Sequence, residues 1–347
     1  MILTSSANDV ANSNYPSGPT VALYAAQLIE RKRNRKKRPN TVNGYDSHLR
    51  NHIVPFAGNR PAASLQRCDS TAFVDYLLEK PSLRSPRTIA QVFKTWRLLM
   101  HYMLDENVRL PANIVTRIEL PEVEFRNDIA LTPGQVAAAA AAIRAIEPRY
   151  EVVVWLCACA GLRRGEALGL TWGRVGWAQG CLRIEEQRQR GMAAPLKTKS
   201  SYATLPVDHF LIKRLVDHSR RFPPTDMATS RAEPGRLTQS HANPADDGLV
   251  VTNSQGMPVQ PGNFYRKWHQ VVDAAGLPEG TRLHSLKRFY TSILGSSGDH
   301  DPKAVQVLSR HARFAETWDT YAQPLSAAGG MRVTAFSASF RSPADAL

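Results

Sequence analysis

The sequence lacks the features that would define a membrane, secreted or zinc-binding protein. No apolar run approaches the ~18 residues that a membrane-spanning helix needs. Residues 1–17 are polar and lack the basic and then apolar pattern of a signal peptide. The four cysteines include no pair at zinc-finger spacing, and Cys157 and Cys159 lie in an apolar run typical of a protein core. We therefore expect a cytoplasmic protein with no membrane partner.

Motifs for nucleotide hydrolysis and for divalent metals are also missing. There is no GxxxxGK[ST] motif and no cluster of carboxylates placed to hold Mg²⁺, so we expect no cofactor. What the sequence does have is positive charge, with 44 Lys and Arg against 30 Asp and Glu and a net charge of +14. Such an excess favours polyanionic partners, because binding to DNA releases counterions. Charge alone leaves open a protein that is merely basic.

Length and local composition predict two domains. The 347 residues exceed one typical domain, and 43% of them are hydrophobic, which is enough for ordinary cores. We expect a disordered leader at 1–17, a helical domain at 18–120, a linker at 121–131, a second domain at 132–325 and a tail at 326–347.

The first domain is predicted to be helical and basic. Apolar residues recur at helical spacing in four segments, which begin near Thr20, Thr41, Ser70 and Ser85. Cations follow the first segment in a dense run and lie on the polar face of the fourth. We expect these cations to contact DNA, although an ordinary solvated face is the alternative. They are Arg31, Lys32, Arg33, Arg35, Lys36, Lys37, Arg38, Arg87, Lys94 and Arg97.

The second domain is predicted to be mixed, with mainly helices and one small β-sheet. Thr132 and Gln135 form a capping-box-like helix start, and the segments 181–187 and 202–207 alternate well enough to be strands. A long polar loop is expected at 222–247. The expected helices cover 133–146, 150–160, 207–221, 262–275, 284–296 and 302–311.

Four segments of this domain carry Arg, Lys, His, His and Tyr in a fixed order. They are AGLRRGEALGLTW (160–172), PLKTKSSYATLPV (195–207), LHSLKRFYTS (283–292) and VLSRHARFAETWDTY (307–321). With these segments the sequence resembles the tyrosine recombinase family of phage and mobile-element integrases. That family has a GLRxxE box, a lysine on a β-hairpin, an HxxR box, an LGH-type histidine and a nucleophilic tyrosine. The first domain, including TVNGYDSHLRNHIVPFAGNRP, resembles the helical core-binding domain of the same family.

The resemblance implies both an architecture and an activity. It implies a core-binding domain and a catalytic domain that clamp double-stranded DNA. It also implies site-specific recombination of a viral genome or mobile element, by integration or excision through a 3′-phosphotyrosyl intermediate, without metal or ATP. The resemblance implies further that four protomers assemble on two DNA sites, and that the tail at 326–347 could pack on a neighbouring protomer. We also expect accessory factors for DNA bending or directionality, and a location at the nucleoid of a prokaryotic host.

The resemblance also assigns roles to individual residues. Arg163 would bind two phosphate oxygens, for which a planar and permanently charged guanidinium is suited. Glu166, three residues on, would support it from the same helix face. His284 would transfer a proton or contact the phosphate, and His311 would donate a hydrogen bond to it. Tyr321 would be the nucleophile, and its phenol must lose a proton during attack.

Two roles remain open between neighbouring residues. A hairpin lysine would protonate the leaving 5′ oxygen, and the pattern KTKSS favours Lys197 over Lys199. The second arginine of the family would fall three residues after His284, where this sequence has Lys287. Either Lys287 takes the role of this arginine, or Arg288 takes it although its side chain points about 100° away on the helix, or the enzyme is impaired. We favour Lys287.

Three other functions compete with the integrase interpretation. A Xer-like resolvase of chromosome or plasmid dimers would use the same chemistry. A DNA-binding protein that kept the fold but lost turnover is supported by Lys287. An unrelated helical transcription regulator is disfavoured by the ordered Arg, Lys, His, His and Tyr.

Overall fold

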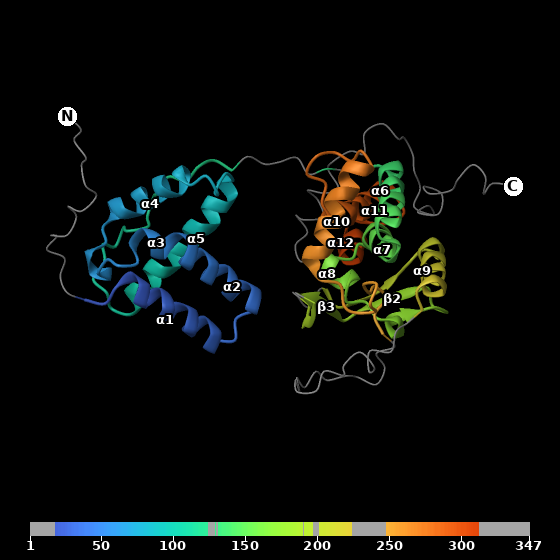
Figure 1. The fold of residues 1–347 in the computed structure, drawn as a ribbon, viewed down its shortest axis with the longest axis horizontal. Helices are drawn as coiled ribbons and strands as arrows, with labels where there is room; N and C mark the ends of the chain where they lie inside the picture. Colours follow the sequence, from blue (N-terminus) through green and yellow to red (C-terminus); the bar gives the residue numbers. More distant parts are fainter. Residues whose placement is uncertain are drawn as a thin grey trace, which may run out of the picture. The chain divides into compact units, whose positions relative to one another are not determined.

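The computed structural model describes residues 18–123, 129, 131–189, 191–196, 201–223 and 248–311 (Figure 1). The chain divides into two compact units, Met1–Arg126 and Asn127–Leu347. The boundary lies within the segment 121–131 that was predicted as a linker. In the described ranges no helix combines the length and apolar character needed to cross a membrane.

The first unit is built around its longest helix, α5. This helix turns a continuous apolar face toward the other helices, and Trp96 at its middle is fully buried. The Trp96 indole stacks on Phe73 with ring centroids 4.6 Å apart and donates a hydrogen bond of 2.8 Å to Ser70 Oγ. The elements are α1 (Val21–Asn34), α2 (Pro39–His48), a π-helical turn (Leu49–Ile53), α3 (Val54–Ala57), a 3₁₀ turn (Ala62–Ser64), α4 (Arg67–Glu79) and α5 (Pro86–Asp105).

The start of α4 differs from the sequence-based expectation. Helix α4 begins at Arg67 instead of Ser70, because Asp69 accepts a hydrogen bond from the Gln66 backbone N–H and caps an earlier start. Helix α1 continues to Asn34, so the first part of the basic run is helical. The helix ends where Lys36 takes a left-handed conformation with φ 51°.

The second unit surrounds one buried helix, α7. Its ten residues are all buried, and it packs against α6, α9 and α11. A helix that is apolar on every side needs such a surrounding layer. The helices of this unit are α6 (Pro133–Ile146), α7 (Glu151–Ala160), α8 (Arg164–Ala167), α9 (His209–Arg221), α10 (Pro261–Ala274), α11 (Leu283–Ser296) and α12 (Pro302–Ser309), with 3₁₀ turns at Pro148–Tyr150 and Trp172–Arg174.

The strands of this unit form two small antiparallel sheets where one was expected. One has the order β1-β2-β5, with Leu182 opposite Leu205, and the other is the hairpin β3-β4. The expected single strand at 181–187 is therefore wrong. The alternation of apolar residues stops at Ile184. The residues Glu186–Gln189 that follow are all half-buried and have no apolar face, and they pair in a separate hairpin. The strands are β1 (Val175–Gly176), β2 (Cys181–Ile184), β3 (Glu186–Gln189), β4 (Met192–Pro195) and β5 (Ala203–Pro206).

Helices α7 and α12 both end in left-handed residues. Gly161 caps α7 with φ 59°, and its position lies against the ring of Tyr290 on α11. Arg310 caps α12 with φ 55°, so this helix stops at Ser309 and does not reach residue 311 as expected. The two ends bring the segments that carry Arg163 and His311 to the same region.

We predict that Gly161→Ala destabilises the second unit by about 2 kcal/mol or more, since a left-handed alanine is strained and its methyl group would overlap Tyr290. Gly276→Ala is the matched control, because Gly276 has φ 57° and no atom within 4 Å of the added Cβ. Chemical denaturation measures both variants. Equal losses of stability in the two would show that the contact with Tyr290 is unimportant.

Candidate functional site

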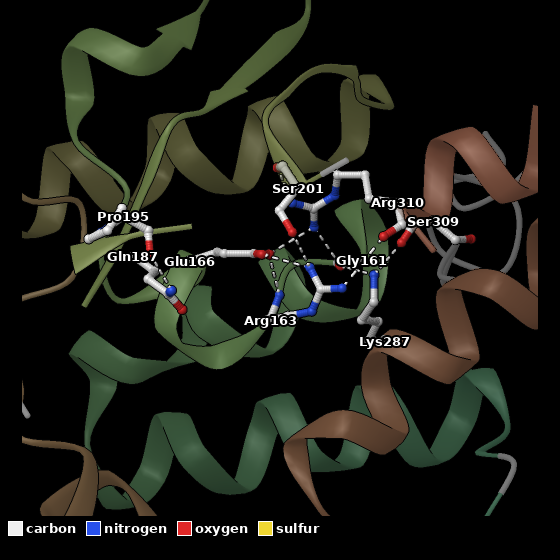
Figure 2. A network of polar contacts seen from close by, with 9 residues as sticks. All are labelled: Gly161, Arg163, Glu166, Gln187, Pro195, Ser201, Lys287, Ser309 and Arg310. Carbon is white, nitrogen blue, oxygen red and sulfur yellow. Dashed lines mark hydrogen bonds and ion pairs between the residues drawn. The ribbon is translucent and has the colours of Figure 1, made fainter. Parts of the chain in front are cut away.

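Three chain segments of the second unit meet in one network of polar contacts (Figure 2). The first runs from Gly161 at the end of α7 to Glu166 in α8, the second is the first half of α11, and the third is the end of α12. A fourth segment joins these through Ser201, which precedes β5, so all four predicted motif segments have residues in the network.

Arg163 directs its guanidinium into this network from the residue before α8. Its Nη1 donates to Glu166 Oε1 at 2.9 Å and to Ser201 Oγ at 3.2 Å, and its Nη2 donates to the Arg310 carbonyl at 3.5 Å. Its backbone N–H donates to Glu166 Oε2 at 2.8 Å. The side chain is still 31% exposed, so a bound anion can reach the guanidinium.

Glu166 is the buried partner of two arginines. Its side chain is 2% exposed, and Arg310 Nη2 donates to Oε2 at 2.9 Å. Burial alone would raise the pKa of Glu166, but the charges of Arg310 and Arg163 and the hydrogen bonds from Arg163 outweigh it, so the pKa is lowered. Glu166 is therefore an ionised carboxylate at neutral pH. Glu166 thus pairs with Arg163 and also with a second arginine, Arg310.

His311 lies in a cationic environment directly after Arg310. Burial first, and then the charges of Lys287, Arg163, His284 and Arg288, together lower its pKa to about 4. His311 is thus neutral at physiological pH and retains both a donor and an acceptor nitrogen. Exposed His284 and half-buried Arg288, both on α11, lie near enough for their charges to act on it.

Lys287 lies inside the protein and does not face solvent. Its side chain is buried, and Nζ donates to the carbonyl oxygens of Gly161 at 2.8 Å and Ser309 at 2.6 Å. Burial, and then the charges of Arg310 and Arg163, lower its pKa well below the usual range. The favoured expectation, that Lys287 serves as the second phosphate-binding cation, requires an amine that faces the phosphate. These contacts direct the amine to two backbone carbonyls instead.

Arg310 and Ser201 belong to the network and were not anticipated as site residues. Arg310 is among the largest fully buried side chains of the described residues. The sequence shows that Arg310 replaces the usual residue before the histidine, but only the folded backbone shows that its side chain turns inward. Ser201 accepts a hydrogen bond from Arg163 across 38 residues of sequence, and no local pattern signals such a contact.

Several other predicted residues lie outside the described residues. They include the nucleophile and both candidate general acids, and the expected leader and tail lie there too. These residues and segments are Lys197, Lys199, Tyr321, 1–17 and 326–347.

The basic residues of the first unit are mostly exposed. Arg87, Lys94 and Arg97 lie on the exposed side of α5, opposite its apolar face. In the basic run, Arg31 pairs with Glu106 at 2.7 Å, whereas the residues from Arg33 to Arg38 are exposed. Lys32 has a lowered pKa, caused first by burial and then by the positive charges of Arg35, Lys37 and Arg31. This mutual repulsion would be relieved by a polyanion.

The described residues contain no group of three or more His, Cys, Asp or Glu side chains arranged to hold a metal ion. The polar centre of the unit instead consists of cations around one carboxylate.

Comparison with known proteins agrees with this arrangement. The model of the phage integrase family matches residues 130–327, more than half of the chain. The chain belongs to the phage integrase family. A XerC-like tyrosine recombinase from Caldanaerobacter subterraneus subsp. tengcongensis is 24% identical over 186 residues, which cover 50% of this chain and 45% of the relative. The chain thus spans about half the length of this relative.

Solved structures share the fold. A structure of the Tn1549 transposon integrase in complex with a circular intermediate DNA has a TM-score of 0.70 at 16% identity, covering 88% of this chain and 96% of that one. A lambda integrase tetramer bound to a Holliday junction has a TM-score of 0.66 at 14% identity, covering 90% and 81%. These similarities confirm the predicted fold class, mainly helical with small β-sheets.

We predict that Glu166→Gln destabilises the second unit by roughly 3–5 kcal/mol, because it leaves the buried Arg310 guanidinium without its counter-charge. Glu185→Gln is the control, since Glu185 pairs with Arg174 but is 48% exposed and should lose less than about 1 kcal/mol. Denaturant unfolding measures both. A loss for Glu166→Gln no larger than the control would contradict a stabilising role for the buried pair.

The lowered pKa of His311 also predicts a pH dependence of stability. Between the ordinary pKa of 6.5 and the folded value of about 4, the unfolded chain binds a proton at His311 that the folded chain does not. Stability should therefore fall as the pH falls through this window. We expect His311→Asn to reduce that fall by about 2 kcal/mol in unfolding experiments at pH 7 and 4.5. His218, with a pKa also near 4, contributes equally to both proteins. Identical pH dependences would contradict the lowered pKa of His311.

Proposed function

We propose that this chain is a site-specific DNA recombinase, of the integrase type, that cuts and rejoins DNA through Tyr321. Its phenolate oxygen attacks a backbone phosphorus, forms a 3′-phosphotyrosyl bond and expels the 5′ oxygen of the next nucleotide. A 5′ hydroxyl of the partner strand then attacks the same phosphorus and releases the tyrosine. The number of phosphoester bonds is conserved, so neither ATP nor metal is required for the energy balance.

The observation that carries the proposal is the half-buried side chain of Arg163, which lies near neutral His311 within a family match that includes Tyr321. The transition state of phosphoryl transfer places extra charge on the nonbridging oxygens. Fixed donors and cations at that point lower the barrier without having to reorganise. Arg163 can bind two such oxygens through its planar fork. His311, neutral before DNA binds, can donate a hydrogen bond to one of them.

Proton transfer requires further groups, which we assign by family resemblance. Lys197, or Lys199 if the hairpin is shifted, protonates the leaving 5′ oxygen. His284 is exposed at the start of α11, near His311, and is our candidate for the second proton-transfer role. Arg288 adds positive charge at the same place.

We further propose double-stranded DNA as the partner and a homotetramer on two sites as the working assembly. The segment 18–120 would be the DNA-binding domain, and its exposed cations on α5 and at 33–38 would contact phosphates, which position a protein on duplex DNA. The segment 132–325 would carry out catalysis. The lambda integrase relative was solved as a tetramer on a Holliday junction. Accessory factors and association with the nucleoid belong to the same proposal.

Resolution of DNA dimers is a second candidate, favoured by the XerC-like relative. The two activities share every chemical step and differ in the arrangement of sites. A resolvase acts on directly repeated sites in one molecule, whereas an integrase also joins sites on separate molecules. Incubation with paired sites in each arrangement separates the two.

We predict that the wild-type chain forms a denaturation-resistant adduct with a nicked duplex, and that Tyr321→Phe forms none. The nick lets the cleaved strand diffuse away, so the phosphotyrosyl bond accumulates. The duplex carries a site selected by this chain from random sequence, and denaturing gels show the adduct. Tyr265→Phe, at an exposed tyrosine of the same unit, is the control and should form the adduct. Tight DNA binding without any adduct would favour a protein that binds DNA but has lost turnover.

A further inference from the structure

Arg310 combines two unfavourable features that require compensation. Its backbone is left-handed, with φ 55° and ψ 41°, a conformation that favours glycine and is uncommon for other residues. Its side chain is 1% exposed, and a buried guanidinium is costly unless it is fully paired. A residue that only ended α12 would be a glycine and would carry no charge into the core.

The contacts of Arg310 connect three segments of the site. Nη2 donates to Glu166 Oε2 and to the Gly161 carbonyl, both at 2.9 Å, and Nη1 donates to the Ser201 carbonyl at 3.4 Å (Figure 2). The Arg310 carbonyl in turn accepts from Arg163 Nη2. One residue therefore links the end of α7, α8, the segment before β5 and Arg163.

Lys287 supports the position of Arg310 through two hydrogen bonds to the backbone. Its amine donates to the carbonyl of Gly161, which Arg310 also contacts, and to the carbonyl of Ser309, the residue before Arg310. Thr291, one turn further along α11, adds a hydrogen bond of 3.0 Å to Ser309 Oγ. Position 287 thus holds the turn that carries Arg310.

We propose that Arg310 is a positioning residue for Arg163 and His311, and that it compensates in this way for the missing second arginine at position 287. This proposal rests on the proposed recombinase function. Two guanidinium groups share one carboxylate, so Arg310 neutralises Glu166 and leaves the positive charge of Arg163 for the phosphate. Without Arg310, the buried carboxylate of Glu166 would be offset by Arg163 alone, and the pair would offer no net charge to the transition state.

The same residue fixes the position of His311. The left-handed turn at Arg310 sets the direction in which the chain leaves α12, and the contacts of its guanidinium anchor that turn to α7 and α8. Arg310 therefore acts on both groups that we assign to the phosphate, without needing to touch it.

The test uses variants that separate the side chain from the backbone. Arg310→Gly removes the guanidinium and adopts φ 55° without strain. Arg310→Lys keeps one charge but loses the planar fork. Lys287→Arg with Arg310→Gly restores the pattern typical of the family. Arg117→Gly is the matched control, because Arg117 is an exposed arginine of the other unit that is also left-handed, with φ 51°.

Each full-length variant is measured on the nicked duplex described above. Fluorescence anisotropy gives the DNA affinity, and the rate of adduct formation at saturating DNA gives the chemical step. We expect Arg310→Gly to bind DNA within about threefold of wild type but to form adduct roughly 10- to 100-fold more slowly, as when a group that orients a catalytic residue is lost. Arg310→Lys should stay slow, Arg117→Gly should match wild type, and the double variant should recover at least about tenfold over Arg310→Gly.

The outcomes distinguish the two proposals. An Arg310→Gly rate within about threefold of wild type overturns the role of Arg310 and leaves the recombinase function standing. If Arg310→Gly does not fold, Arg310→Lys decides, and a wild-type rate in that variant overturns the role. Absence of adduct in the wild type contradicts the recombinase function itself, and the role of Arg310 with it.

Discussion

The polar network of the second unit depends on the carboxylate of Glu166, which is held between two guanidinium groups. Glu166 is buried, and it is stable there as an anion only because Arg163 and Arg310 both donate to it. The arrangement has a chemical consequence, since two cations around one anion leave a positive charge in excess. The arginine that remains exposed is Arg163, so the excess charge is available at the surface.

Two helix ends provide the geometry for that carboxylate. Gly161 ends α7 in a left-handed turn that only glycine fits beside Tyr290, and its carbonyl then accepts from both Lys287 and Arg310. Arg310 ends α12 in a second left-handed turn. Because α7 is buried on every side, these ends are attached to the most rigid part of the unit.

Most of the fold could be predicted from the sequence because the patterns that determine it are local. The apolar period of α5 and the capping box at Thr132 and Gln135 are readable in a short window, and both lie where expected. The break between β2 and β3 was missed because both segments favour strands, and only long-range pairing decides which sheet each joins.

The site was predictable in part for the same reason. Arg163 and Glu166 are three residues apart and were expected on one helix face, but Arg163 is the extended residue before α8 and pairs with Glu166 through a capping box, which is also a local arrangement. The contact between Arg310 and Glu166 joins residues that are 144 positions apart, and no local signal indicates it. At position 287 the sequence left three alternatives open and favoured a lysine that serves the phosphate, but a motif does not give the direction of a side chain. Burial turns Lys287 toward two backbone carbonyls instead.

The most direct test of the central claim is a double-mutant cycle between Glu166→Gln and Arg310→Met in the free energy of unfolding. If the buried carboxylate depends on Arg310, the losses of stability from the two substitutions should couple by at least about 2 kcal/mol. Either single substitution already leaves the other group buried without its partner, so the second substitution adds little. Additive losses, with a coupling below about 0.5 kcal/mol, would show that the two residues are energetically independent and would contradict the account.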